Sequence, residues 1–295
     1  MHTTVSLATL PGLVLLGIAV GFIAGAFGVG GGFLLTPLLV AVFRVPLGVA
    51  IGTSLCQIIG TATASLLRHQ KLKQGELRFD LLLLPGGILG VEGGARLLEA
   101  LQRRGDVTLF GHTAPVANLL LESLYGATLI GVAALYWRRS KHAQLDGVRP
   151  GPLARLRFGP STSLPAVPLD HVSTIVIAYL GLALGVLSGL LGIGGGIALM
   201  PVMLYGYGFP FRQAAGTGVL VLVVTSLVGT LSHALRGNVD LGLALVLMTG
   251  STVSAQFGAL AAKRWPERAL TRLNALVVLA ALAAIAWDIG RRFGG

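Results

Sequence analysis

The residues best suited to bind a ligand in this sequence are glycines, which occur twice in the same arrangement. Each group interrupts a long apolar run; the members are Gly28, Gly30, Gly31 and Gly32, and then Gly192, Gly194, Gly195 and Gly196. A short helix that starts at such a break presents free N–H groups and the positive end of its dipole. Amides of this kind bind oxyanions without a charged side chain. The glycines therefore predict a binding site for a small anionic substrate, with close helix packing as the alternative.

Proline and threonine follow each glycine group at matching distances. Pro37 and Pro201 lie in short apolar segments, and we expect them to break these helices and to take part in gating. Thr53 and Thr217 each follow a glycine in the next segment. Their hydroxyls are predicted to contact substrate, and the alternative is a hydrogen bond to their own backbone.

Three titratable residues in or beside apolar segments are candidates for proton coupling: Glu92, His69 and His233. A carboxyl group inside a membrane segment is a functional candidate by default. Because Arg96 follows Glu92 by one helical turn, a structural ion pair is the alternative. The histidines titrate near neutral pH, but their places near the predicted membrane boundaries favour an interfacial role.

No pattern in the sequence predicts a catalytic centre, a metal site or a cofactor. The glycine groups lack the lysine of a phosphate-binding loop, and the single cysteine, Cys56, lies inside an apolar run. The net charge is +11, but the basic residues lie between apolar runs without aromatic interleaving, so nucleic acid is not an expected partner. We expect a protein that is not an enzyme.

The composition indicates which elements must position these residues. The chain has 295 residues, of which 54% are hydrophobic and 11% charged, with a mean hydropathy of +0.82. Soluble domains carry about 25% charged residues. Apolar runs long enough to cross ~30 Å of hydrocarbon recur along the chain. Because lipid requires each backbone polar group to pair within its own segment, we predict an all-α integral membrane protein with the bilayer as its partner. The oligomeric state is not readable.

Ten apolar segments are expected, in two sets of five. They are 10–27, 31–43, 48–67, 81–101 and 117–137, and then 172–191, 195–207, 214–235, 241–262 and 273–289. The second segment of each set has 13 residues, which as a helix reaches ~20 Å and does not span a bilayer. One offset of 164 residues aligns the two sets over residues 21–96 and matches proline, threonine, histidine and glycine as well as apolar residues. The sequence therefore contains an internal duplication.

The connections predict the topology. Each short segment forms a hairpin with the segment before it, so each half crosses the membrane an odd number of times. The halves, residues 1–137 and 171–295, are then inverted-topology repeats joined by a basic linker, 138–170. The side that carries the linker collects 15 of the 22 Lys and Arg residues, which predicts a cytoplasmic linker. The first apolar run lacks the features of a cleaved signal and is expected to be a retained span.

The doubled pattern resembles the TauE/SafE family of membrane permeases, also called the sulfite exporter or toluene-sulfonate uptake permease family. Both halves contain Gly-Xaa-Xaa-Ala/Ser-Gly-Xaa-Xaa-Gly-Val/Ile-Gly-Gly-Gly, a proline five residues later, and then Ala-Xaa-Gly-Thr. The resemblance covers almost the whole chain. The linker 138–170, and Glu92 where the second half has Gln256, depart from the family pattern.

This resemblance implies a secondary transporter of small sulfur-containing anions, such as sulfite, sulfonates or sulfoacetate, in the bacterial plasma membrane. Substrate is expected to bind between the two hairpins near the bilayer midplane, with alternating access as the two halves rock against each other. The alternatives are a passive anion channel and a non-transporting accessory membrane protein of sulfur metabolism.

Overall fold

The structure is a computed structural model, and it describes residues 9–103, 105–109, 112–140, 150–167 and 169–293. The first half contains helices α1 (Leu10–Phe27), α2 (Gly32–Ala41), α3 (Leu47–Lys71), α4 (Leu77–Gln102) and α5 (Val116–Ser140). The second half contains α6 (Thr174–Leu191), α7 (Gly196–Pro201), a π-helical segment η2 (Val202–Tyr207), α8 (Phe211–Gly216), α9 (Val219–Leu235), α10 (Leu241–Arg264) and α11 (Glu267–Phe293).

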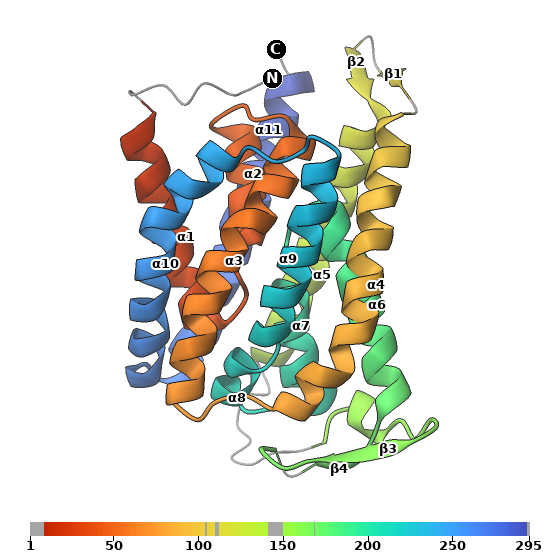
Figure 1. The fold of residues 1–295 in the computed structure, drawn as a ribbon, viewed down its shortest axis with the longest axis vertical. Coiled ribbons are helices and arrows are strands. Elements are labelled where there is room, and N and C mark those ends of the chain that lie inside the picture. The colour runs from red at the N-terminus through yellow and green to blue at the C-terminus, as the bar shows by residue number, and fades with distance from the viewer. Residues whose placement is uncertain (1–8, 104, 110–111, 141–149, 168, 294–295) are drawn as a thin grey trace.

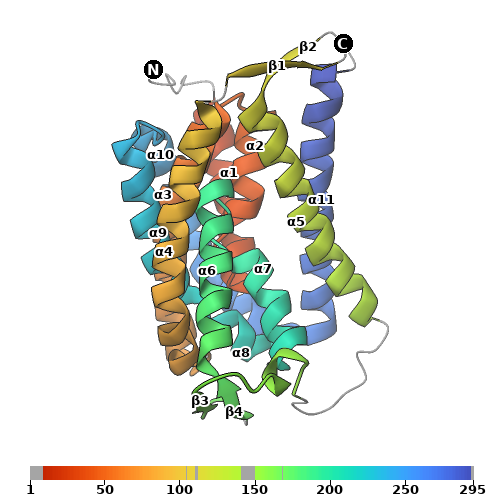
Figure 2. The same cartoon turned by 90° about the vertical axis from the view of Figure 1, so that its right-hand side faces the viewer.

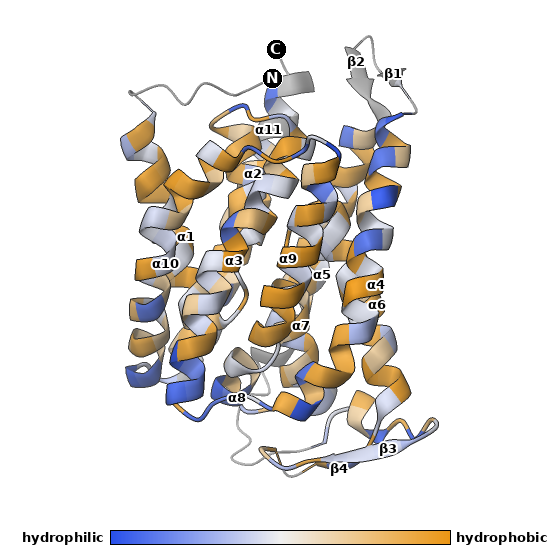
Figure 3. Ribbon diagram, in the orientation of Figure 1, coloured by the Kyte–Doolittle hydropathy of each residue, from blue (hydrophilic) through white to orange (hydrophobic). Residues whose placement is uncertain are grey.

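The predicted all-α polytopic membrane fold is confirmed. Among the described residues, eight spans are long and apolar enough to cross a bilayer. The segments containing α2, and α7 with η2, are shorter apolar helices, as expected from the positions of the glycines. Apolar residues cover most of the helix surfaces, whereas polar residues gather at the lower ends of α3 and α10 and along the upper part of α4 (Figure 3).

Two small hairpins lie at opposite ends of the bundle (Figure 1). Strands β1 (Asp106–Leu109) and β2 (His112–Pro115) pair antiparallel between α4 and α5. Strands β3 (Ser161–Leu164) and β4 (Leu169–Ser173) pair antiparallel just before α6, after a short 3₁₀ turn, η1 (Leu153–Arg155). Part of the segment expected to be an irregular linker is therefore a hairpin, and Ser173 at its end caps α6 by accepting a hydrogen bond from the Val176 amide.

The two halves are intertwined rather than side by side. The most extensive helix contacts in the described residues join α1 to α10 and α4 to α6, which are equivalent pairs under the 164-residue offset. Glycines make these contacts possible: Gly17, Gly21 and Gly25 on α1 face α10, and Gly181, Gly185 and Gly189 on α6 face α4. A Cβ atom at any of these positions would overlap a backbone oxygen of the partner helix.

The first helices of the halves run in opposite directions. In Figure 1, α1 starts at the upper end of the bundle, and α6 starts at the lower end, where β3 and β4 lie. Figure 2 shows α2 and α7 turning back from the middle of the bundle toward opposite ends, while α5 and α11 lie next to each other on the outside. The orientation of the halves in a membrane stays a prediction.

Candidate functional site

Both glycine groups form breaks between helices. α1 ends at Phe27 and α2 begins at Gly32, and α6 ends at Leu191 and α7 begins at Gly196. Three glycines in each break have positive φ: Gly28, Gly30 and Gly31 at 66°, 79° and 81°, and Gly192, Gly194 and Gly195 at 68°, 73° and 77°. L-residues with a side chain are strained in this region, so the repeated spacing is a backbone requirement.

The two breaks touch each other inside the bundle. A Cβ atom on Gly32 would overlap the carbonyl oxygen of Gly192, and one on Gly196 would lie 2.6 Å from the carbonyl oxygen of Val29. All four residues are buried. The structure therefore brings together the two glycine groups that were predicted to bind substrate.

Two apolar side chains cover both breaks, Ile58 on α3 and Leu222 on α9. A Cβ atom on Gly30 would lie 3.2 Å from Ile58 Cγ2 and 3.4 Å from Leu222 Cδ1. The equivalent atom on Gly194 would lie 2.9 Å from Ile58 Cδ1 and 3.3 Å from Leu222 Cδ2. Ile58 and Leu222 are themselves equivalent under the offset. In this conformation the two side chains occupy the space into which a Cβ atom at Gly30 or Gly194 would point.

The amides in the breaks differ in what they bind. The Gly28 amide donates to the carbonyl of Ala24 at 2.8 Å, and the Gly192 amide donates to that of Ser188 at 2.9 Å. These two glycines therefore close the preceding helices. Within the described residues, no hydrogen bond is found from the amides of residues 29–33 or 193–197. These are the amides that remain as donors to an anion.

The two predicted threonines already have partners in the protein. Thr53 Oγ1 accepts a hydrogen bond from the Asp240 amide at 3.0 Å, and Thr217 Oγ1 accepts one from the Glu76 amide at 2.9 Å. Thr217 Oγ1 also donates to the carbonyl of Gln213. Thr53 thus links α3 to the residue before α10, and Thr217 links the junction of α8 and α9 to the residue before α4. Thr217 would have to give up its bond to Gln213 to donate to a substrate, whereas Thr53 only accepts in its bond with Asp240 and keeps its hydroxyl proton as a donor.

A buried acidic residue missed by sequence reasoning lies beside Thr217. Asp80 on α4 is 4% exposed, and its Oδ1 accepts a hydrogen bond of 2.5 Å from the Gly218 amide at the N-terminus of α9. We predicted an uninterrupted segment over 214–235, but α8 ends at Gly216, and α9 begins after Gly218, which has a φ of 86°. The sequence predicts the fourth segment from residue 81 onward, which leaves Asp80 just outside it, whereas α4 begins at Leu77. Its flanking apolar residues were the available signal.

The prolines behave differently in the two halves. Pro37 lies inside α2, which continues to Ala41. Pro201 is the last residue of α7, and the chain continues from it as the π-helical segment η2. The helix type thus changes at Pro201 and stays the same through Pro37, and the roles of both prolines in breaking helices and in gating stay predictions.

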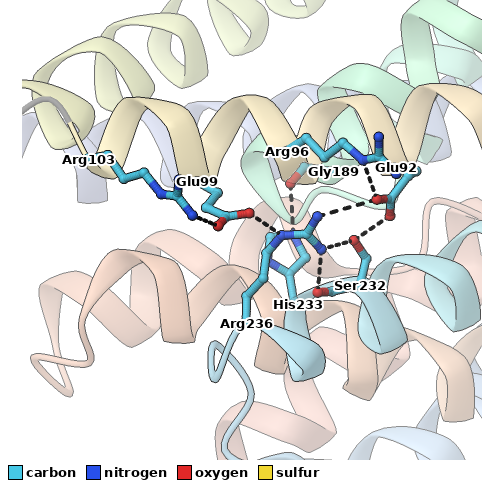
Figure 4. A network of polar contacts seen from close by, with 8 residues as sticks. All are labelled: Glu92, Arg96, Glu99, Arg103, Gly189, Ser232, His233 and Arg236. Carbon is cyan, nitrogen blue, oxygen red and sulfur yellow. Dashed lines mark hydrogen bonds and ion pairs between the residues drawn. The ribbon is translucent and has the colours of Figure 1, made fainter.

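Glu92 belongs to a cluster of charged residues that joins α4 to the end of α9 (Figure 4). Its carboxylate pairs with Arg96 at 2.7 Å and with Arg236 at 3.3 Å, and it accepts a hydrogen bond from Ser232. Glu99 binds the other side of Arg236 at 2.8 Å. These carboxylates, Glu99 above all, raise the pKa of Arg236, which follows the last residue of α9. The Glu92–Arg96 pair expected as the structural alternative is therefore present.

Both histidines are buried in the bundle, in the last turns of α3 and α9, and the interfacial position that the sequence favoured stays a prediction. His69 is 2% exposed and His233 is 0% exposed. His69 Nε2 lies 3.3 Å from the carbonyl oxygen of Gly25, and His233 Nε2 lies 2.9 Å from that of Gly189. Each ring thus contacts the last turn before a break: His69 on α3 reaches α1, and His233 on α9 reaches α6.

Two cavities adjoin the breaks. One lies between α2, α3 and α5 and is lined by residues that include Thr36, Pro37, Leu121 and Tyr125. The other lies beside the second break and is lined by residues that include Gly194, Gly195, Ser188, Leu199, Val221 and Leu222. The walls of both are mainly apolar.

Comparisons with known proteins place this architecture among transporters. A family model described as "Sulfite exporter TauE/SafE" matches residues 13–285. The chain is 26% identical to the "Probable membrane transporter protein YunE" of Bacillus subtilis, over 90% of this chain and 93% of that protein. It is 27% identical to the "Probable membrane transporter protein MJ0441" of Methanocaldococcus jannaschii, over 85% and 86%, and 27% identical to a "Probable membrane transporter protein" of Xylella fastidiosa, over 91% of each. No solved structure matches.

Proposed function

The chain belongs to the TauE/SafE family of membrane transporters, and on that premise we propose that it is a secondary carrier of small sulfur-containing anions such as sulfite, sulfonates or sulfoacetate. The family description, which names a sulfite exporter, supports this substrate class. The free amides of the two breaks supply donors suited to an oxyanion.

The contact between the two breaks is the observation that carries the proposal. Gly32 meets Gly192 and Gly196 meets Val29, while α2 and α7 leave this contact toward opposite ends of the bundle (Figure 2). A substrate held there is reachable from either end when one hairpin moves away from the other. We therefore propose alternating access between inverted halves.

We place the protein in the bacterial plasma membrane with the linker, residues 138–170, in the cytoplasm. The lower end of the bundle, which carries the 68–78 loop, the α10–α11 junction and the β3–β4 hairpin, has the larger share of Lys and Arg (Figure 3).

We further propose that transport is coupled to protons through His69 and His233. Each ring contacts the carbonyl of a glycine that lies three residues before a break, whereas Glu92 is held in ion pairs. Protonation of either ring changes what it donates to that carbonyl. Flux in proteoliposomes that rises with an imposed pH gradient in the wild type, and not in His69→Gln or His233→Gln, supports coupling. Flux that ignores the gradient refutes it.

The proposed function is tested by anion counterflow in proteoliposomes that contain the purified full chain. The panel is sulfite, sulfoacetate, methanesulfonate, sulfate and acetate. Saturable counterflow of the sulfur oxyanions is expected, whereas unitary currents would indicate a channel. No movement of any sulfur oxyanion refutes the proposal.

Matched glycine variants test the role of the breaks. Gly31→Leu and Gly195→Leu place a side chain at φ of 81° and 77°, so we expect both to insert into the membrane and to lose flux. Gly126→Leu is the control, because a Cβ atom at Gly126 meets nothing within 4 Å. Wild-type flux in both break variants would contradict binding by the amides.

A further inference from the structure

Gln57 on α3 is a buried polar residue that no structural role explains. Its side chain is 0% exposed. Neither Nε2 nor Oε1 has a hydrogen-bond partner among the described residues. A buried carboxamide without partners is destabilising, and native proteins avoid it. Its presence therefore points to a ligand.

The neighbours of Gln57 along α3 define what it faces. Ser54 and Thr61 lie three residues before it and four after it, on the same face of the helix. Ser54 Oγ accepts a hydrogen bond from Thr36 Oγ1 on α2 at 3.0 Å, and Thr61 Oγ1 donates to the carbonyl of Gly30 at 3.3 Å. Gln57 lies between these two contacts, so it faces the first turn of α2, where the amides of residues 29–33 are free of partners.

The equivalent position in the second half has the opposite character. The 164-residue offset places Val221 at the position of Gln57 and Gly87 at that of Ser251. Val221 and Gly87 line the small cavity beside the second break. Ser251 is 0% exposed, and its Oγ, like the Gln57 amide, has no partner among the described residues. Val221 therefore faces a mainly apolar cavity, whereas Gln57 brings an unpaired carboxamide to the equivalent position.

We propose that Gln57, together with the amides at the start of α2, binds the oxyanion head of the substrate, and that the second-half cavity receives its apolar part. The site then selects an organic oxyanion with one charged head and one apolar substituent over a bare inorganic oxyanion. This inference rests on the proposed function. It adds a residue that determines specificity and an orientation for the bound substrate.

The test uses the purified full chain in proteoliposomes, with sulfite, methanesulfonate and hexanesulfonate as competitors in counterflow. The wild type is expected to bind hexanesulfonate more tightly than sulfite. Gln57→Met, which keeps the volume and removes the hydrogen-bonding groups, is expected to bind all three at least about tenfold more weakly. Its melting temperature should stay the same or rise, because an unpaired buried amide has been removed. A purely structural residue would lower melting temperature and affinity together.

Val221→Gln makes the reciprocal change at the equivalent position and is expected to weaken the binding of hexanesulfonate more than that of sulfite. Gly126→Leu is the control, because a Cβ atom at Gly126 meets nothing within 4 Å, and it is expected to bind all three probes like the wild type. Gln57→Val serves as the second variant if Gln57→Met does not fold, with the same expected loss for all three probes.

The outcomes separate the two proposals. A wild type that moves none of the probes overturns the proposed function and this inference with it. A wild type that moves them while the Gln57 variants match it overturns the role of Gln57 alone. Equal wild-type affinity for sulfite and hexanesulfonate overturns the apolar half of the site.

Discussion

Two adjacent glycines on α4 should respond to alanine in opposite ways. Gly94 lies against α6: a Cβ atom there would overlap the carbonyl oxygen of Val186 and lie 3.0 Å from the amide nitrogen of Leu190. Gly93, one residue earlier, has nothing within 4 Å of the same position. Both are helical, so both gain the same intrinsic helix preference on substitution.

The expected magnitudes follow from these contacts. Glycine to alanine in a helix interior is worth about 1 kcal/mol of added stability, which Gly93→Ala should show in full. Gly94→Ala gains the same amount, but overpacking costs ~1–3 kcal/mol, and the obstacle is backbone that cannot rotate away. The free energy of unfolding of Gly94→Ala should therefore be about 1–3 kcal/mol below that of Gly93→Ala.

The assay is unfolding of both variants and the wild type, in one detergent, by titration with a denaturing detergent. Tryptophan fluorescence follows the transition, and size-exclusion chromatography confirms that each variant starts as a single species. If Gly94→Ala is as stable as Gly93→Ala, α4 and α6 are not in backbone contact, and the intertwined arrangement of the halves is wrong.

Three further predictions concern polar contacts, measured by the same unfolding titration. Arg236→Ala removes ion pairs to two carboxylates and should cost about 1.5–3 kcal/mol, whereas Arg96→Ala, whose side chain is 72% exposed, should cost about 0–1 kcal/mol; equal costs would refute the central place of Arg236. Asp80→Ala removes the acceptor for the Gly218 amide and should cost about 0.5–2 kcal/mol, with the exposed Asp170→Ala as control; no difference between them would contradict the cap on α9. His233→Ala should cost about 1–3 kcal/mol because the buried carbonyl of Gly189 loses its partner, and wild-type stability would contradict the hydrogen bond.

Residue type and spacing were enough to predict the breaks. Positive φ is accessible at low cost only to glycine, so three such positions in a four-residue stretch leave a pattern that lipid-facing or packing glycines do not repeat. The approximate extents of the spans were predictable for a related reason, since apolar length is set by the bilayer. The predicted first segment, 10–27, coincides with α1.

The contacts between the two halves could not be predicted from the sequence in the same way. The offset of 164 residues identifies equivalent helices, but it does not say that α1 packs on α10 rather than on α4. The burial of His69 beside α1 and of His233 beside α6 depends on such packing, so the sequence alone did not predict it. The break at Gly218 rests on a single glycine where the first half has Ser54, and a lone glycine in an apolar segment is ordinary helix packing.

The duplication distinguishes side chains that hold the fold together from side chains that could select the substrate. Side chains that both halves share, such as Thr53 with Thr217 and His69 with His233, all bind backbone groups of the protein. Gln57, which the second half replaces by Val221, has no such partner. The shared glycines leave equivalent backbone donors free in both breaks, so under the proposed function these donors alone would not distinguish the two ends of a substrate. A carrier with two equivalent breaks has no means of orienting an asymmetric substrate, and the positions at which the halves differ must supply it.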